Sequence, residues 1–272
     1  MRVHGCIDSA ARLGLDGHAC WGFEQRQEFT AAVLEFLTEG RRLGQRIAFI
    51  GDEPVADQRE RLDALGEVGA LIDSGALVLF ELDTLYPGAR PVDVDAQLAL
   101  YAAATDASLA DGYTGLRVAA HVTDLVRDPE TREAHLRWEC FADRALSTKP
   151  LTVLCGYRRD LLPPQLLHDL AAIHPAANAD RDTVPFHLFG QDGDLALAGE
   201  IDHFSGAAFD RALGFACGPG EAPPVNLEAL DFIDHRGVEI LARHARPSGS
   251  GRSVRNEPPV LNRLCDLLGV QL

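Results

Sequence analysis

The first 175 residues alternate short apolar runs with longer amphipathic segments, and this alternation limits the possible folds more than any other feature. Strands are predicted at 46–50, 76–82, 115–122 and 151–157, and helices at 24–43, 57–69, 92–109, 129–146 and 164–173. The run ALVLFEL at 76–82 is continuous enough for a strand buried on both faces. Because each strand returns only after a helix, the pattern predicts a parallel sheet covered by helices on both faces.

The last third of the chain has a different rhythm. Small polar residues at 176–183 predict a linker between two units. Beyond it we expect strands near 186–190, 194–200 and 224–228, helices near 205–214, 236–245 and 259–268, and a brief strand at about 252–255. The sequence therefore predicts an α/β protein with a parallel-sheet domain at 1–178 and a small α/β domain at 184–272.

The composition narrows the class of protein. The chain has 272 residues, 46% of them hydrophobic, and a formal net charge of −16. This acidic charge disfavours binding to nucleic acid or to an anionic membrane surface. No apolar run approaches the roughly 20 residues of a membrane-spanning helix, and MRVHGCIDSA lacks the apolar core of a secretory signal. We expect a cytoplasmic location, and because none of the 6 cysteines forms a CxxC pair, most of them should be buried thiols.

Two predicted strands near the C-terminus end in an acidic residue beside a helix start. They lie in LALAGEIDHFSG (195–206) and VNLEALDFIDHRG (225–237), and an amphipathic segment ending LCDLLGVQL (264–272) follows. The order and spacing of these pieces resemble a STAS domain, the fold of bacterial anti-sigma factor antagonists. The resemblance implies a surface that binds an anti-sigma factor or a related serine-kinase-like signalling protein.

Six short motifs in the first 175 residues resemble the MEDS domain, a sensory domain of methanogen and methylotroph regulators. They are HACWGF (18–23), LGQRIAFIGDE (43–53), YTGLRVAAHVTDLV (113–126), RWECFADRAL (137–146), LCGY (154–157) and IHP (173–175). The resemblance implies a three-layer domain related to the RecA/KaiC nucleotide-binding fold, in agreement with the Rossmann-like alternation of strands and helices. A MEDS domain followed by a STAS domain implies a sensor joined to an output module.

The STAS resemblance places the partner surface at the helix start after the third strand. Asp234 can cap that helix, and Asp202 is expected close by at the end of another strand. The family usually has a phosphorylated serine or threonine where this chain has His235, so the usual phosphorylation switch is in doubt. The alternative is that Asp234 is only a cap and Asp202 only a solvated strand end. The predicted surface comprises Asp202, Phe204, Ser205, Phe232, Asp234, His235, Arg236 and Gly237.

The N-terminal unit has no GxxxxGK[ST] motif, and its only lysine, Lys149, lacks a glycine loop. We therefore expect no ATP hydrolysis of the P-loop type. The acidic pair after strand 46–50 would repel a phosphate, which favours a neutral or cationic ligand in the crevice there. The residues expected to line a sensory pocket are His18, Cys20, Trp21, Asp52, Glu53, Glu139, Cys155, Tyr157 and His174.

The leading interpretation is a non-catalytic regulator without a cofactor, in which a small molecule or a partner controls docking on an anti-sigma factor. Histidines and cysteines in the pocket leave a metal ion or haem as an alternative. A Glu139–His121 pair, if the two side chains met, would suit acid–base catalysis, and so an enzyme without a P-loop lysine is a rival class. A third possible class is a scaffold protein of a STAS assembly that senses no ligand. The sequence also leaves open whether the chain forms a homodimer.

Overall fold

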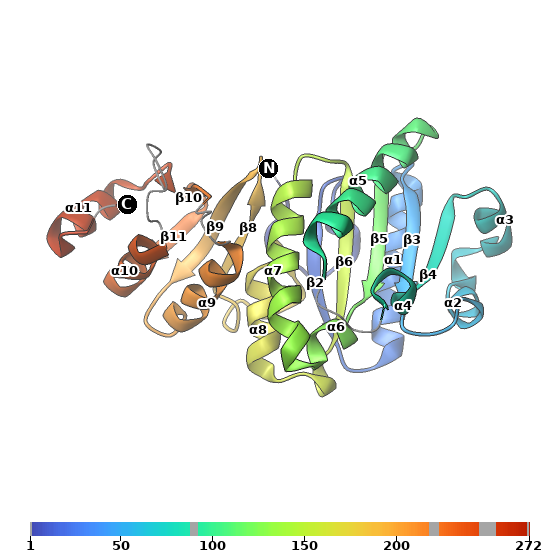
Figure 1. Ribbon diagram of the computed structural model, residues 1–272, viewed down its shortest axis with the longest axis horizontal. Helices are drawn as coiled ribbons and strands as arrows, with labels where there is room; N and C mark the ends of the chain where they lie inside the picture. The colour runs from blue at the N-terminus through green and yellow to red at the C-terminus, as the bar shows by residue number, and fades with distance from the viewer. Residues whose placement is uncertain (1, 88–91, 218–222, 245–253, 271) are drawn as a thin grey trace.

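The parallel sheet predicted for the N-terminal unit is present. The computed structural model describes residues 2–87, 92–217, 223–244, 254–270 and 272. Seven parallel strands lie in the order β1-β7-β2-β6-β5-β3-β4 (Figure 1). They span Gly5–Cys6 (β1), His18–Phe23 (β2), Arg46–Gly51 (β3), Leu77–Glu81 (β4), Leu116–His121 (β5), Leu151–Arg158 (β6) and Ala176–Ala177 (β7).

Helices cover both faces of this sheet. On one face α1 packs the apolar stripe of Phe29, Val33, Phe36 and Leu37 against β2, β3, β5 and β6. On the other face lie α5, α7 and α8 (Figure 1). The helices span Arg26–Arg42 (α1), Val55–Arg61 (α2), Val68–Asp73 (α3), Leu82–Leu85 (α4), Val94–Ala110 (α5), Asp124–Arg127 (α6), Pro129–Leu146 (α7) and Pro164–Ala172 (α8), with 3-10 turns at Ala10–Arg12, Asp63–Leu65 and Arg159–Leu161.

The C-terminal unit is a smaller mixed sheet with its own helices. Strand β8 (Phe186–Gln191) runs antiparallel to β9 (Asp194–Ile201). On its other side β9 pairs in parallel first with β10 (Val225–Asn226) and then with β11 (Leu230–Ile233), and β10 pairs with β12 (Val254–Arg255). The helices are α9 (Gly206–Ala216), α10 (His235–His244) and α11 (Pro259–Leu268).

Three expectations about individual elements need correction, and two further elements are only partly described. Strand 76–82 was expected to be buried on both faces, but β4 is a half-buried edge strand and its last predicted residue begins α4. The helix predicted at 57–69 is broken at Gly66 and Glu67, whose positive φ angles of 70° and 53° are not helical. The predicted linker at 176–183 begins with β7, which is buried inside the sheet. Residues 245, 252 and 253 of two other expected elements lie outside the described residues.

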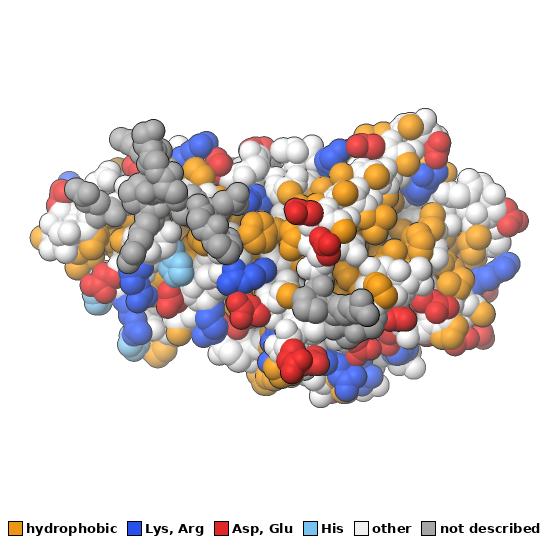
Figure 2. All heavy atoms as spheres, viewed as in Figure 1, with side chains coloured by type: hydrophobic (Ala, Val, Ile, Leu, Met, Phe, Trp, Pro, Cys, Tyr) orange, Lys and Arg blue, Asp and Glu red, His pale blue; other side chains and the backbone are white. Residues whose placement is uncertain are grey.

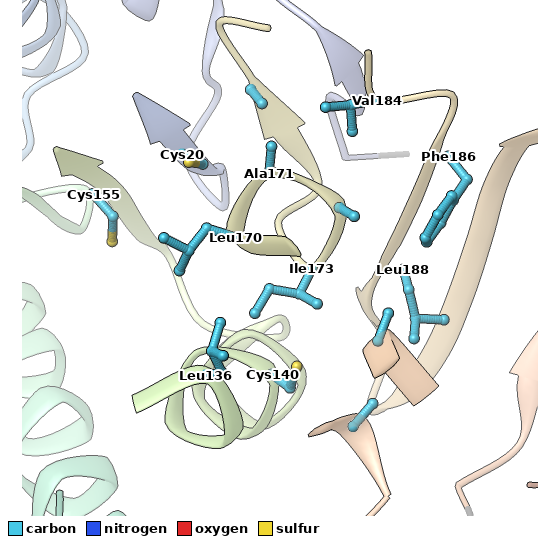
Figure 3. Close-up of a cluster of buried hydrophobic side chains, with 14 of the residues drawn as sticks. Cys20, Leu136, Cys140, Cys155, Leu170, Ala171, Ile173, Val184, Phe186 and Leu188 are labelled. Atoms are coloured by element: carbon cyan, nitrogen blue, oxygen red, sulfur yellow. The ribbon is translucent and has the colours of Figure 1, made fainter. Parts of the chain in front are cut away.

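The two units share one hydrophobic cluster. Figure 3 shows Leu136, Cys140 and Ile173 of the first unit facing Phe186 and Leu188 of β8. The backbone of β8 also lies directly on α7. A Cβ atom built on Gly190 would be 2.3 Å from the Cα atom of Arg144, a position that only glycine can occupy at this separation. The boundary between the predicted domains is thus a packed interface.

The described surface carries charges of both signs. Figure 2 shows acidic side chains with basic ones between them, and hydrophobic side chains gathered along α5, where Leu100 and Leu109 are exposed. Among the helices of the described ranges, none has both the length and the apolar character needed to cross a membrane.

Candidate metal centre

Four buried donor atoms from four different elements meet at the face of the sheet covered by α7 and α8. His18 lies on β2, Cys155 on β6, Glu139 on α7, and His174 two residues after the end of α8. One donor atom from each side chain lies within 4.8 Å of every other. All four residues are buried, and Cys155 belongs to the same buried hydrophobic cluster as Leu170 and Ile173 (Figure 3).

Four of the six separations between these atoms are close to the edges of a coordination tetrahedron. His18 Nε2 lies 3.3 Å from Glu139 Oε2 and 3.4 Å from Cys155 Sγ. Glu139 Oε2 lies 3.6 Å from His174 Nε2 and 3.9 Å from Cys155 Sγ. A tetrahedral ion with bonds of about 2.0–2.3 Å separates its ligands by about 3.3–3.8 Å. These four pairs could therefore bind a common ion with little movement of the side chains, and the two remaining pairs, which both involve His174, lie within 4.8 Å.

The outer nitrogen of each histidine is held by an acceptor. His174 Nδ1 donates to the carbonyl oxygen of Leu170 at 2.7 Å, which leaves Nε2 with its lone pair toward the other donors. His18 Nδ1 donates to Asp143 Oδ1 at 3.0 Å, and Asp143 is bound in turn by Arg2 at 2.8 Å. A ring nitrogen bonded to a carboxylate or carbonyl is the usual support of a metal-binding histidine.

Glu139 offers one oxygen to the centre and bonds through the other. Its Oε1 lies 2.8 Å from His135 Nε2 and accepts a hydrogen bond of 3.0 Å from the Tyr157 hydroxyl. These contacts orient the carboxylate so that Oε2 faces His18 and Cys155. Because Oε1 already has two partners, Glu139 would coordinate an ion through Oε2 alone.

The electrostatics of the metal-free cluster leave one donor without a partner. Burial and the neighbouring His18 lower the pKa of His174 to about 3, so His174 is neutral. Its buried Nε2 has no hydrogen-bond partner among the described residues. Burial opposes ionisation of Glu139, but His135 and the other histidines hold its pKa well below the usual value. Burial and the charge of Glu139 raise the pKa of Cys155 to about 11, so it is a thiol until a metal displaces the proton.

The donor set favours a borderline metal ion. Two imidazole nitrogens, one sulfur and one carboxylate oxygen suit Zn²⁺ or Fe²⁺, whereas Mg²⁺ and Ca²⁺ prefer oxygen ligands. A cavity of about 40 Å³ adjoins the cluster, far too small for a haem. The cluster therefore fits a single ion.

The other residues of the predicted sensory pocket lie in three places. Cys20 pairs in register with Cys155 in the same buried layer, and Tyr157 contacts Glu139, but the group of four donors includes neither. The prediction that Trp21 lines this pocket is wrong. Its side chain points to the opposite face of β2 and packs in the hydrophobic cluster that includes the apolar stripe of α1.

Asp52 and Glu53 do not line the same pocket as the donor cluster, but the crevice that the sequence predicts after strand 46–50 is present beside them. They follow β3 at the carboxyl edge of the sheet and line a crevice of about 400 Å³. The expected Glu139–His121 pair does not form here. His121 Nδ1 lies 2.8 Å from Asp52 Oδ1, and its Nε2 lies 2.9 Å from the hydroxyl of Thr123.

The sequence analysis missed three polar residues that support the centre. His135 and Asp143 flank Glu139 at intervals of four on α7, which places all three on one side of the helix. This spacing of four was the available signal. Arg2 is the third, and its buried pair with Asp143 joins two segments that no sequence pattern connects.

The predicted partner surface lies at adjacent strand ends of the C-terminal unit. The amide of Asp234 donates to the carbonyl oxygen of Ile201, which brings the end of β11 beside Asp202. Asp234 caps α10 by accepting from the Gly237 amide at 2.8 Å. Phe204 and Phe232 are 90% and 51% exposed, and His235 and Arg236 are also exposed. Ser205 and Gly237 are buried beneath them.

A three-layer α/β domain with a buried donor cluster in its interior is thus the class that the fold and site define. A family model described as MEDS, the methanogen/methylotroph, DcmR sensory domain, matches residues 17–175, which is more than half of the chain. The chain belongs to the MEDS family, and its role is in sensing and signalling. The matched range contains all four donor residues.

Comparison with individual proteins adds little to this family assignment. No curated protein matches the chain. Among solved structures, the crystal structure of the flagellar accessory protein FlaH from Methanocaldococcus jannaschii is similar, with 12% sequence identity and a TM-score of 0.40. The match covers 67% of this chain and 75% of FlaH. The relation to RecA and KaiC stays a prediction.

Proposed function

We propose that the protein is a metal-dependent sensory regulator, with the ion held by His18, Glu139, Cys155 and His174. The observation that carries the proposal is a buried group of four donor atoms that all lie within 4.8 Å of one another, with four of the six separations between 3.3 and 3.9 Å. An unpaired buried nitrogen such as His174 Nε2 costs about 1–3 kcal/mol, and coordination would remove this penalty. This proposal replaces the expectation of a protein without a cofactor.

Metal analysis of the purified full-length chain tests this proposal. We expect about one Zn²⁺ or Fe²⁺ per chain. Cys155→Ser is expected to lose at least ten- to a hundredfold in metal affinity, because a hydroxyl is a much poorer ligand than a thiolate. Cys20→Ser is the matched control, since Cys20 is an equally buried cysteine in register with Cys155 but outside the donor group.

The metal affinities of the two serine variants decide the outcome. Equal losses of metal affinity in both variants would show that the effect does not depend on which buried cysteine is replaced. This result would contradict the assigned ligand set. A well-folded chain that binds no Zn²⁺ or Fe²⁺ in competition titrations with chromophoric chelators would overturn the proposal altogether.

The C-terminal unit is the proposed output of the sensor. Asp143 joins the two, because Oδ1 accepts from His18 while Oδ2 accepts from the Gly190 amide of β8 at 2.5 Å. The carbonyl oxygen of His174 accepts a second bond to this strand, from His187 Nδ1 at 2.9 Å. If binding at the metal centre favours one position of β8, it would shift the C-terminal unit toward the conformation that contains this position.

We propose that this output is docking on an anti-sigma factor of the serine-kinase type, in the cytoplasm. Phe204 and Phe232 provide an apolar contact, with Asp202 and Asp234 at its edge. Residue 235 is histidine and does not accept phosphate from a serine kinase. Ser205 is buried and its hydroxyl donates to Asp202 Oδ1, so a kinase would not reach it without unfolding the loop.

Substitution of the two exposed aromatic residues tests docking. Phe204→Ser is expected to weaken binding to a purified anti-sigma kinase domain by about 30-fold or more, the effect of losing an aromatic hot spot. Its thermal stability should be unchanged, because the side chain is 90% exposed. Leu267→Ser is the control, since Leu267 is also exposed but lies on α11.

One measurement would contradict the docking proposal, and a second would contradict only the absence of a phosphorylation switch. One is equal binding by the wild type, Phe204→Ser and Leu267→Ser across the anti-sigma kinase domains tested by calorimetry. The other concerns the missing phosphorylation switch. Stoichiometric phosphate at Ser205 after incubation with these kinases and ATP would show that the protein is switched in the usual way.

A regulator without catalytic activity remains our proposal over the enzyme alternative. The nearest arrangement to a catalytic triad is Asp52–His121–Thr123. The Thr123 hydroxyl also accepts from the Arg158 amide, and the residue is only 2% exposed. A substrate would have no approach to this hydroxyl.

A further inference from the structure

The cavity beside the donor cluster lies on one particular side of it. His18, Glu139 and Cys155 all line the cavity, whereas His174 does not. The cavity therefore borders the three donors other than His174, and a further ligand in it would approach the ion from their side.

The size of the cavity limits what can bind in it. Its volume is about 40 Å³, and a single water molecule needs about 10–15 Å³ of such space. The space thus suits about three non-hydrogen atoms. Its walls are largely apolar and aromatic, and the only hydroxyls among them, those of Tyr86 and Tyr101, lie 3.3 Å apart and bond to each other. Besides the three donors, the residues that line the cavity are Tyr86, Tyr101, Ala120, Val122, Trp138, Ala142, Leu146, Leu151 and Val153, together with Gly17 and the polar residues Arg2, His135 and Asp143.

The charge of the loaded site selects a neutral ligand. A divalent ion is balanced by the thiolate of Cys155 and the carboxylate of Glu139, with both histidine ligands neutral. The nearby charges of Asp143 and Arg2 balance each other through their buried pair. An anionic fifth ligand would add an unpaired charge to a buried, mostly apolar space, which is strongly unfavourable.

We propose that the metal centre binds a neutral molecule of up to about three non-hydrogen atoms, bearing a lone pair, in the cavity beside the other three donors. This inference deepens the proposed function and rests on it, because the ligand binds through the metal. A new coordinate bond forms to the ion and none breaks, so binding needs no oxidant or reductant. The protein would then sense whether this cavity is filled.

Nitric oxide is a suitable probe, since it is neutral, has two atoms and binds Fe²⁺. The full-length chain is loaded anaerobically with one Fe²⁺, and metal content is measured first. Titration with nitric oxide is expected to give one iron nitrosyl per iron by electron paramagnetic resonance and visible absorption. Azide has three atoms and a negative charge, and we expect it to bind at least 100-fold more weakly than nitric oxide.

Cavity-filling variants locate the binding site. Ala142→Leu adds three carbon atoms to the cavity wall and is expected to weaken nitric oxide binding at least tenfold while metal content stays at one per chain. Ala145→Leu is the matched control, because Ala145 is exposed on the same helix. Ala120→Val fills the cavity from β5 and serves if Ala142→Leu does not fold.

The outcomes separate this inference from the proposed function. An iron-loaded chain that forms no nitrosyl overturns the inference but leaves the metal centre intact. Binding of azide as tightly as nitric oxide overturns the charge argument. Nitric oxide affinity unchanged in both cavity variants places the ligand elsewhere and also overturns the inference. A chain that takes up no metal fails at the first measurement, which counts against the proposed function itself.

Discussion

Chelation of the metal from the loaded protein is expected to lower the midpoint of thermal unfolding by about 8–16 °C. A ligand that binds only the folded state at a free concentration of about 1,000 times its Kd stabilises by about 4 kcal/mol. In a chain of this size each kcal/mol shifts the midpoint by about 2–4 °C. The site links β2, β6, α7 and the end of α8, so its loss weakens the centre of the larger unit.

Calorimetry with and without chelator makes this measurement, and a variant without ligands provides its control. The double variant Cys155→Ser/His174→Gln should unfold at a similar temperature with and without chelator. An equal effect of chelator on this double variant would show that the stabilising ion lies elsewhere. Complete metal removal with no change in the wild-type midpoint would contradict a buried centre of the proposed kind.

The alternation of strands and helices was sufficient to predict most of the larger unit. Apolar strands with continuous burial, such as β5 and β6, are readily recognised. Strand β2 was missed because HACWGF combines a polar residue, a glycine and aromatic residues without a clear period. The order of the strands in the sheet places β4 at an edge and β7 in the interior. Local sequence carries little information about this order, so neither position was predicted.

The donor residues were predicted as members of a looser set. His18, Glu139, Cys155 and His174 were selected from motifs that resemble a family, since they are too far apart in sequence for a ligand spacing. Only three-dimensional structure separates them from Trp21, because one step along a strand reverses the direction of a side chain.

The supporting shell was the least predictable part of the site. Glu139 by itself does not indicate that Asp143 lies on the same side of the helix, and only the spacing of four along α7 relates the two residues. The partner of Asp143 is Arg2, at the other end of the N-terminal unit, and a long-range pair of this kind has no local pattern.

Removal of Arg2 is expected to have the largest effect of any single substitution outside the donor set. Arg2 bonds Asp143 Oδ1 at 2.8 Å, and the side chains are only 6% and 1% exposed. It also donates to the carbonyl oxygens of Gly190 at 2.6 Å and Asp16 at 2.7 Å. Arg2→Met leaves a buried carboxylate without its counter-charge, a loss of about 3–5 kcal/mol in the free energy of unfolding.

Urea denaturation of metal-saturated protein measures this loss, and a double-mutant cycle assigns it to the ion pair. Asp143→Asn keeps an oxygen for the Gly190 amide but removes the charge, so Arg2→Met/Asp143→Asn should be at least about 2 kcal/mol more stable than the sum of the single effects predicts. Arg127→Met is the control, because Arg127 and Asp124 form a pair with both side chains 54% exposed, worth at most about 1 kcal/mol. Additive single effects, or equal losses in Arg2→Met and Arg127→Met, would show that the Arg2–Asp143 pair does not hold β8 and the metal centre together.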